Sequence, residues 1–150
     1  MSIVAQPRSP RFEEIWFDGV DDMLVEARSR LRRLSPRAAY QATLWGTAVI
    51  VDVRPAAQRA VQGDVDPRLN PLVVERVDLE WRLDPRSRAR LPQADYDLPV
   101  VVLDAEGTTS SLAAESLQRL GVHAATDVVG GFTAWRRQGM PVAPPPTVRS

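Results

Sequence analysis

Asp104 opens a polar loop that carries most of the residues able to do chemistry in this chain. The loop holds two carboxylates and three hydroxyls within seven residues. A carboxylate can act as a general base or a nucleophile, and a pair of them can bind a hard cation. Asp104 and Glu106 supply fewer oxygen ligands than such a cation needs, so we expect no metal and no cofactor here. The candidate loop residues are Asp104, Ala105, Glu106, Gly107, Thr108, Thr109 and Ser110.

The segments on either side of this loop predict a strand and a helix. The apolar run 99–103 is typical of a strand buried on both faces. After the loop, Leu112, Leu117 and Leu120 recur at helical spacing, and Gly121 stands where the helix should end. Strand, loop and helix together form a crossover unit of a parallel sheet. The loop then lies at the carboxyl end of the strand, where open α/β sheets bind ligands and where unpaired N–H groups favour an anion.

Composition limits the possible functions. The chain has 150 residues, and its 19 basic residues, all arginine, balance 19 acidic ones, so charge gives no reason to expect nucleic acid or a membrane as partner. Without cysteine there is no disulfide, thiolate metal site or thiol nucleophile, and without lysine there is no Schiff base. No long apolar run or leader pattern is visible, so we expect a cytoplasmic protein.

An amphipathic helix is expected over residues 18–34, because apolar residues recur there at spacings of three and four. Acidic residues come early and arginines late, which complements the helix dipole and predicts a solvated basic end. Before the helix stands an apolar group that docks either on the domain or on a second subunit, and we expect a homodimer through residues 12–34. The apolar group is Phe12, Ile15, Trp16 and Phe17, and the arginines are Arg28, Arg30, Arg32 and Arg33.

The rest of the chain alternates strand and helix signals. Ser35 followed by Pro36 is typical of an N-cap and first helical residue, and that helix should end at Gly46. His123 follows a helix-ending glycine and is expected at the surface, whereas Trp135 is expected in the core. The remaining expected strands are 47–52, 72–77 and 125–129, and the remaining expected helices are 56–61, 84–90 and 132–138.

The loop alone resembles two families. The string from Asp104 to Thr108 is similar to the Asp-x-Asp-Gly-Thr motif of haloacid-dehalogenase phosphotransferases, with Glu106 in place of the second acid. That family carries its aspartate motif early and has cationic motifs after it. Only 46 residues follow Asp104, and none is lysine, so this interpretation fails.

The order of landmarks along the chain resembles a single-domain rhodanese. The resemblance covers about residues 34–142 and implies a single α/β domain with a central parallel sheet and helices on both faces. We therefore expect an N-terminal extension over 1–34, a rhodanese-like domain over 35–142 and a Pro-rich tail over 143–150. The landmarks are Asp52-Val-Arg54, Gly63, the loop 104–110, Gly130-Gly-Phe132-x-x-Trp135 and Gly139-x-Pro141.

Against the rhodanese pattern, Asp104 stands at the position of the catalytic cysteine. A rhodanese works because loop N–H groups and a helix N-terminus lower a thiol pKa and hold its persulfide, and a carboxylate has no route to a persulfide. Asp104 then either satisfies the loop donors itself or serves as a carboxylate nucleophile or base. The resemblance implies a non-catalytic binding or regulatory module for a protein or a small anionic ligand. The alternative is an Asp104-dependent hydrolase of an anionic ester.

Three further residues are expected to support the loop. Asp52 and Arg54 resemble the family pair beside the active loop, as a salt bridge or a substrate contact. Trp81 lies on the segment that in this family approaches the pocket rim, where it either packs in the core or contacts a ligand.

Overall fold

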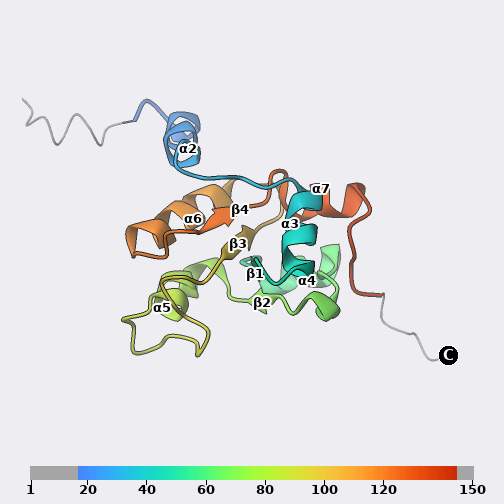
Figure 1. The fold of residues 1–150 in the computed structure, drawn as a ribbon. Coiled ribbons are helices and arrows are strands. Elements are labelled where there is room, and N and C mark those ends of the chain that lie inside the picture. Colours follow the sequence, from blue (N-terminus) through green and yellow to red (C-terminus); the bar gives the residue numbers. More distant parts are fainter. Residues whose placement is uncertain (1–16, 145–150) are drawn as a thin grey trace, which may run out of the picture.

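A four-stranded parallel sheet forms the centre of the structure, a computed structural model that describes residues 17–144 (Figure 1). The central strands β1 and β3 pair over their full length, with Val49 opposite Val100 and Asp52 opposite Leu103. Because the strands are parallel, their carboxyl ends all lie at the same end of the sheet. The strand order is β2-β1-β3-β4, with β1 (Val49–Asp52), β2 (Leu72–Val73), β3 (Val100–Leu103) and β4 (Thr126–Asp127).

Helices cover both faces of this sheet, as the resemblance implied (Figure 1). Successive side chains of a strand point to opposite faces, so β3 contributes to two hydrophobic clusters. Val100 and Val102 pack with α5 and α6, and Val101 and Leu103 pack with α3, α7 and the fully buried Trp135. The helices are α2 (Val20–Arg28), α3 (Pro36–Leu44), α4 (Ala56–Gln62), α5 (Leu79–Leu83), α6 (Thr109–Arg119) and α7 (Gly131–Arg137), with 3-10 turns η1 (Pro67–Leu69) and η2 (Arg76–Asp78).

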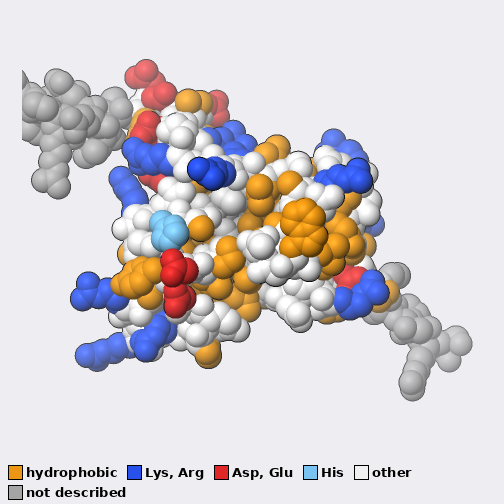
Figure 2. Space-filling view, viewed as in Figure 1, with side chains coloured by type: hydrophobic (Ala, Val, Ile, Leu, Met, Phe, Trp, Pro, Cys, Tyr) orange, Lys and Arg blue, Asp and Glu red, His pale blue; other side chains and the backbone are white. Residues whose placement is uncertain are grey.

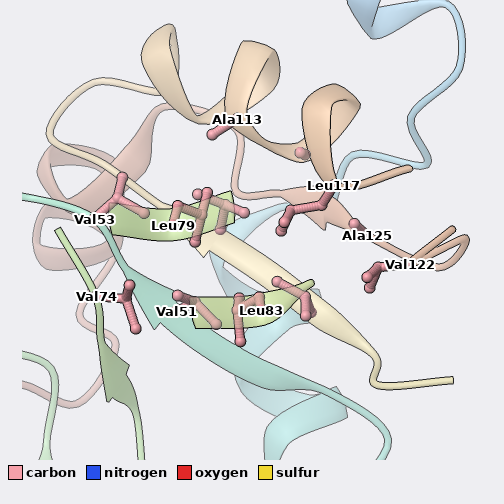
Figure 3. Packing of buried hydrophobic residues seen from close by; sticks show 12 residues of the cluster. Val51, Val53, Val74, Leu79, Leu83, Ala113, Leu117, Val122 and Ala125 are labelled. Atoms are coloured by element: carbon pink, nitrogen blue, oxygen red, sulfur yellow. The ribbon is translucent and has the colours of Figure 1, made fainter. Parts of the chain in front are cut away.

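The cluster on the α5–α6 side fixes where the central strand–loop–helix unit sits. Figure 3 shows Ala113 and Leu117 of α6 in the same cluster as Leu79, Leu83 and Val51. All five of these side chains are fully buried. Because α6 begins directly after the loop that follows β3, this packing fixes the direction in which the loop leaves the sheet.

Residues 17–34 pack against the outside of this unit. Helix α2 lies against α6 and buries Leu24 and Ala27 there (Figure 1). The helix ends at Arg28, six residues earlier than expected, because the chain then extends along β4. There the Leu34 N–H donates to the Asp127 carbonyl at 3.0 Å, and the Val129 N–H donates to the Leu34 carbonyl at 2.8 Å. Chain pairing at the sheet edge thus replaces the last predicted turns of the helix.

The apolar group proposed for self-association lies mostly outside the described residues. Phe12, Ile15 and Trp16 belong to the part of the chain that the structure does not describe, and Phe17 is half-buried. Val20 and Val25 remain exposed on α2. The homodimer through residues 12–34 therefore stays a prediction.

Two predicted elements between β1 and β3 were wrong. The expected helix over 84–90 is a series of turns, and the helix lies just before it, at α5. Leu79 and Leu83, four residues apart, bury their side chains in the core, whereas the polar residues after Asp84 have nothing to bury. The expected strand over 72–77 keeps only two residues before the chain turns into η2, where Val77 is exposed.

Other local predictions are confirmed. The Ser35 hydroxyl accepts a hydrogen bond from the Ala38 N–H at 3.1 Å, so Ser35 is the N-cap of α3. His123 lies at the surface beside a carboxylate (Figure 2), with 2.9 Å between its Nε2 and the Asp97 Oδ1. None of the helices within residues 17–144 has the length and apolar character required to cross a bilayer.

We expect Leu117→Ala to lower the free energy of unfolding by about 2–5 kcal/mol, because it opens a cavity between α6 and the sheet. The matched control is Val61→Ala on α4, where the side chain is 86% exposed and the change should stay within about 0.5 kcal/mol. Urea denaturation measures both. Equal stabilities of the two variants would contradict the placement of α6.

Candidate functional site

The Asp104 carboxylate lies buried within the loop that follows β3. It accepts hydrogen bonds from three backbone N–H groups of that loop, those of Gly107, Thr108 and Ser110, the last two at 3.0 Å each. Only 6% of the residue is exposed. Backbone donors that converge on one point at a helix start form an anion site, and here the side-chain carboxylate is the anion. Of the two interpretations of Asp104, this geometry matches the one in which it satisfies the loop donors itself.

Two glycines allow the loop to take this shape. Gly107 has a φ of +83°, and a Cβ added there would lie 2.6 Å from the Gly130 nitrogen. Gly131, with a φ of +59°, would place a Cβ 2.7 Å from the Asp104 carbonyl oxygen. That carbonyl accepts the Phe132 N–H at 2.8 Å, which joins the loop to the start of α7. The Gly-Gly-Phe landmark is therefore the surface on which the loop rests.

A second buried carboxylate, Asp127 at the end of β4, ties the neighbouring segments together. It is fully buried and accepts Arg33 Nε at 2.9 Å. The hydroxyls of Ser110 and Ser111 both donate to its Oδ2 at 2.8 Å. A buried charge requires such compensation, so Asp127 fixes the first turn of α6 and the segment after α2 in one position.

Two arginines of the N-terminal segment reach the loop itself. Arg28 Nη2 and Arg33 Nη2 both donate to the Gly107 carbonyl, at 2.8 and 2.9 Å. Arg28 Nε also donates to the Ser111 hydroxyl at 3.1 Å. The expectation of a solvated basic end was therefore wrong for Arg28 and Arg33, although it holds for the exposed Arg30. Nothing local distinguishes these arginines, because their partner on the loop is more than 70 residues away.

Asp52 and Arg54 form a buried ion pair beside the loop. Arg54 Nη2 and Nε donate to the two Asp52 oxygens at 2.7 and 3.0 Å. The guanidinium also donates to the Gly63 carbonyl at 2.9 Å, and it lies 4.0 Å from the centroid of the Phe132 ring. The structure thus shows the salt bridge that was one of the two expectations for this pair. It also brings the Asp-Val-Arg, glycine and Gly-Gly-Phe landmarks into contact.

A cavity of about 460 Å³ opens between the loop and the segments after β1 and β2. It carries charges of both signs, and Asp52 already compensates one of the two guanidiniums. Within residues 17–144, no group of three or more His, Asp or Glu side chains is arranged to hold a metal ion. The charged residues of the cavity wall are Arg54, Glu75, Arg76, Asp104 and Glu106.

Arg76 is held at the cavity by Glu80. Its Nη1 donates to the two Glu80 oxygens at 2.8 and 3.0 Å. Burial raises the pKa of Glu80, but hydrogen bonds from the Ser116 hydroxyl and from Arg76 outweigh it and lower that pKa below its ordinary value. Glu80 therefore stays ionised at neutral pH and keeps Arg76 in place. Sequence inspection did not identify Arg76 or Glu75 as part of the site.

Trp81 is not part of this cavity. Its side chain is 61% exposed on α5, and it lines a separate shallow hollow with Glu80 and Leu120. Core packing was one of the two expectations for Trp81, and its exposure contradicts that expectation. The reason is the position of α5, which buries Leu79 and Leu83 and so turns Trp81 outward.

Comparison with known proteins identifies a family that shares this fold. Residues 35–138 match the family model described as Rhodanese-like domain. Curated relatives include the thiosulfate sulfurtransferases GlpE of Vibrio cholerae, 38% identical over 52 residues, and of Actinobacillus pleuropneumoniae, 36% identical over 52 residues. Each match covers 35% of this chain, and the chain spans about half the length of these relatives, 49% and 48%.

Solved structures show the same fold. A Rhodopseudomonas palustris protein of unknown function, a possible tyrosine phosphatase, is 31% identical with a TM-score of 0.75. That match covers 85% of this chain and 96% of the other. The polysulfide-sulfur transferase homodimer of Wolinella succinogenes is 24% identical with a TM-score of 0.62, covering 81% of this chain and 85% of the other, and it supports the fold alone.

We expect Gly107→Ala to lower the free energy of unfolding by about 2–4 kcal/mol, because it adds a backbone clash to the strain of a positive φ. Gly46→Ala is the matched control. Its φ is +71°, but its added Cβ would meet nothing within 4 Å, so it should cost only about 1 kcal/mol. Thermal unfolding of both variants measures the difference, and equal losses would show that the loop does not rest on Gly130.

Proposed function

The chain belongs to the rhodanese-like domain family, and we propose that it is a non-catalytic member that acts as a binding or regulatory module. The observation that carries this proposal is the Asp104 carboxylate bound by three N–H groups of its own loop. In a sulfur-transferring member, those donors would hold the negative charge of a thiolate or persulfide. Here a side chain that cannot carry sulfur uses them.

The missing thiol supports the proposal independently of geometry. Sulfur transfer through a persulfide needs a sulfur nucleophile that accepts the sulfane atom and then passes it on. This chain has no cysteine at any position, so no other residue can take over that role. A carboxylate oxygen forms no persulfide, and the cycle cannot begin.

The cavity next to the loop is the natural place for binding. Its wall carries Glu75, Arg76 and Glu106 in addition to the internally satisfied Asp104 and Arg54. A small anion would find the N–H groups of Gly107, Thr108 and Ser110 occupied by Asp104. The two guanidiniums of the wall, Arg54 and Arg76, are already paired with Asp52 and Glu80. A partner polypeptide that presents both charge signs fits this wall better than a small anion does.

The alternative, an Asp104-dependent hydrolase of an anionic ester, finds less support. Gly107 donates to Oδ1 of Asp104, while Thr108 and Ser110 donate to Oδ2. Each of these hydrogen bonds occupies an oxygen lone pair that a nucleophile or base would have to direct at the substrate. The same donors would also be needed to bind the anionic ester. The carboxylate and the substrate would therefore compete for one set of N–H groups.

We expect no thiosulfate:cyanide sulfurtransferase activity and no hydrolysis of p-nitrophenyl phosphate by the native chain. Thiocyanate and p-nitrophenol release are measured against a no-enzyme blank, with Asp104→Ala as the matched control. A signal above the blank that Asp104→Ala abolishes would overturn the proposal of a non-catalytic module.

Sulfate should stabilise Asp104→Gly but not the native protein, because removal of the carboxylate frees the loop donors for an external anion. At a sulfate concentration one hundred times its Kd, the expected gain is about 2.7 kcal/mol. Asp97→Gly is the control for a lost negative charge, since the Asp97 side chain is 87% exposed and its carboxylate contacts His123 rather than the loop. Thermal unfolding across a sulfate series gives the answer, and equal stabilisation of all three proteins would show that Asp104 does not occupy the anion site.

A further inference from the structure

One peptide group of the loop connects the N-terminal segment to the Asp104 carboxylate. Its carbonyl belongs to Gly107 and accepts Arg28 and Arg33 at 2.8 and 2.9 Å. Its N–H belongs to Thr108 and donates to Asp104 Oδ2 at 3.0 Å. Two guanidinium groups and one carboxylate therefore bind opposite ends of the same amide.

This arrangement strengthens the amide as a donor. Charged donors at a carbonyl oxygen draw electron density toward it and make the N–H of the same peptide more positive, so hydrogen bonds in such a chain reinforce one another. The effect is selective. The other two donors to Asp104, the N–H groups of Gly107 and Ser110, belong to the Glu106–Gly107 and Thr109–Ser110 peptides, and the hydrogen bonds of the two arginines go to neither of those carbonyls.

The arginines come from a segment that the family match does not include. Both precede residue 35, where that match begins. Leu24 and Ala27 hold α2 against α6, and Leu34 pairs with the edge of β4, so both ends of the segment are fixed. Arg33 is further held by Asp127, whereas the hydrogen bonds of Arg28 within residues 17–144 go to the Gly107 carbonyl and the Ser111 hydroxyl.

We propose that Arg28 and Arg33 are positioning residues of the loop, which polarise the Gly107–Thr108 peptide and so set how strongly the loop binds a negative charge at position 104. The N-terminal segment then contributes directly to the anion site, although it precedes the part of the chain that the family model matches. Displacement of α2 from α6 would withdraw the Arg28 guanidinium and weaken the site, whereas Asp127 would still hold Arg33. This inference concerns the loop of the proposed function but does not depend on whether the module is catalytic.

The first test uses the native loop and Arg28→Met, which removes the guanidinium but leaves the Arg33–Asp127 pair. We expect the Thr108 amide proton to move upfield in NMR spectra and to exchange with solvent several-fold faster, while the Ser110 amide stays unchanged. Arg30→Met is the matched control, because Arg30 lies on the same segment and pairs with Glu26 and Glu115 at the surface. Equal changes at Thr108 and Ser110 would indicate simple loosening of the loop and overturn the inference, as would no change at Thr108.

The second test replaces the Asp104 carboxylate with a thiol, whose ionisation can be followed by its rate of alkylation. In Asp104→Cys, the pH midpoint of iodoacetamide alkylation reports the pKa of the introduced thiol, which the loop should lower below about 8.5. Adding Arg28→Met should raise that midpoint by about half a unit, a threefold change in thiolate fraction at pH values well below the midpoint, and adding Arg30→Met should leave it unchanged. Coincident midpoints for the two double variants would overturn the inference. Neither readout depends on a partner or on activity, so failure here is distinguishable from failure of the proposed function.

Discussion

The hydrogen bonds to the buried Asp104 carboxylate set the shape of the loop on which the rest of the site depends. A buried carboxylate is tolerated only when hydrogen bonds replace the water that it has lost. The N–H groups of Gly107, Thr108 and Ser110 converge on it to do so. Such convergence needs a left-handed residue in the loop, which Gly107 supplies, and a close backbone surface beneath it, which Gly131 supplies. The Asp104 side chain therefore occupies the anion site and also holds the loop in the shape that forms this site.

Three of the parallel strands end at or next to a buried aspartate, and each aspartate is compensated in a different way. Asp52 after β1 pairs with Arg54 two residues later, so its compensation is local. Asp104 after β3 uses backbone N–H groups and needs no cation in direct contact. Asp127 at the end of β4 combines a guanidinium from the N-terminal segment with two hydroxyls of α6. The like charges at the carboxyl ends of the strands are thus each compensated separately, by ion pairs or by hydrogen bonds, and this fixes three different segments around the site.

The features predicted correctly from sequence depend on local patterns. The run 99–103, the helical spacing after it and the Ser35-Pro36 start of α3 each follow from neighbouring residues, and the structure reproduces them. The parallel sheet followed from the resemblance and from buried apolar runs. The error at 84–90 arose because turn-forming residues were taken for a helix start, while the burial of Leu79 and Leu83 decided the helix position.

The features that could not be predicted depend on contacts between distant segments. Arg28 and Arg33 look like any basic helix end until α2 is packed on α6, and only then does their reach to the Gly107 carbonyl become visible. Arg76 pairs with Glu80 only four residues away, but the cavity wall that it joins is completed by Arg54 and Asp104 from other segments. The sequence shows the charge of such a side chain, but it does not show which carbonyl or carboxylate the side chain will contact.

In the proposed alignment, in which Asp104 takes the place of the family's catalytic cysteine, a carboxylate preserves the electrostatics of the loop but has no sulfur chemistry. A thiolate and a carboxylate both place one negative charge at the start of α6, so the loop donors remain satisfied in either case. An apolar residue at this position would instead leave three N–H groups without their acceptor, at a cost of about 1–3 kcal/mol for each one left unsatisfied. Stability alone therefore favours an anionic side chain here once the thiol is absent. Because Asp104 already accepts three N–H groups of the loop, we propose that this chain binds a partner on the cavity wall at Glu75, Arg76 and Glu106.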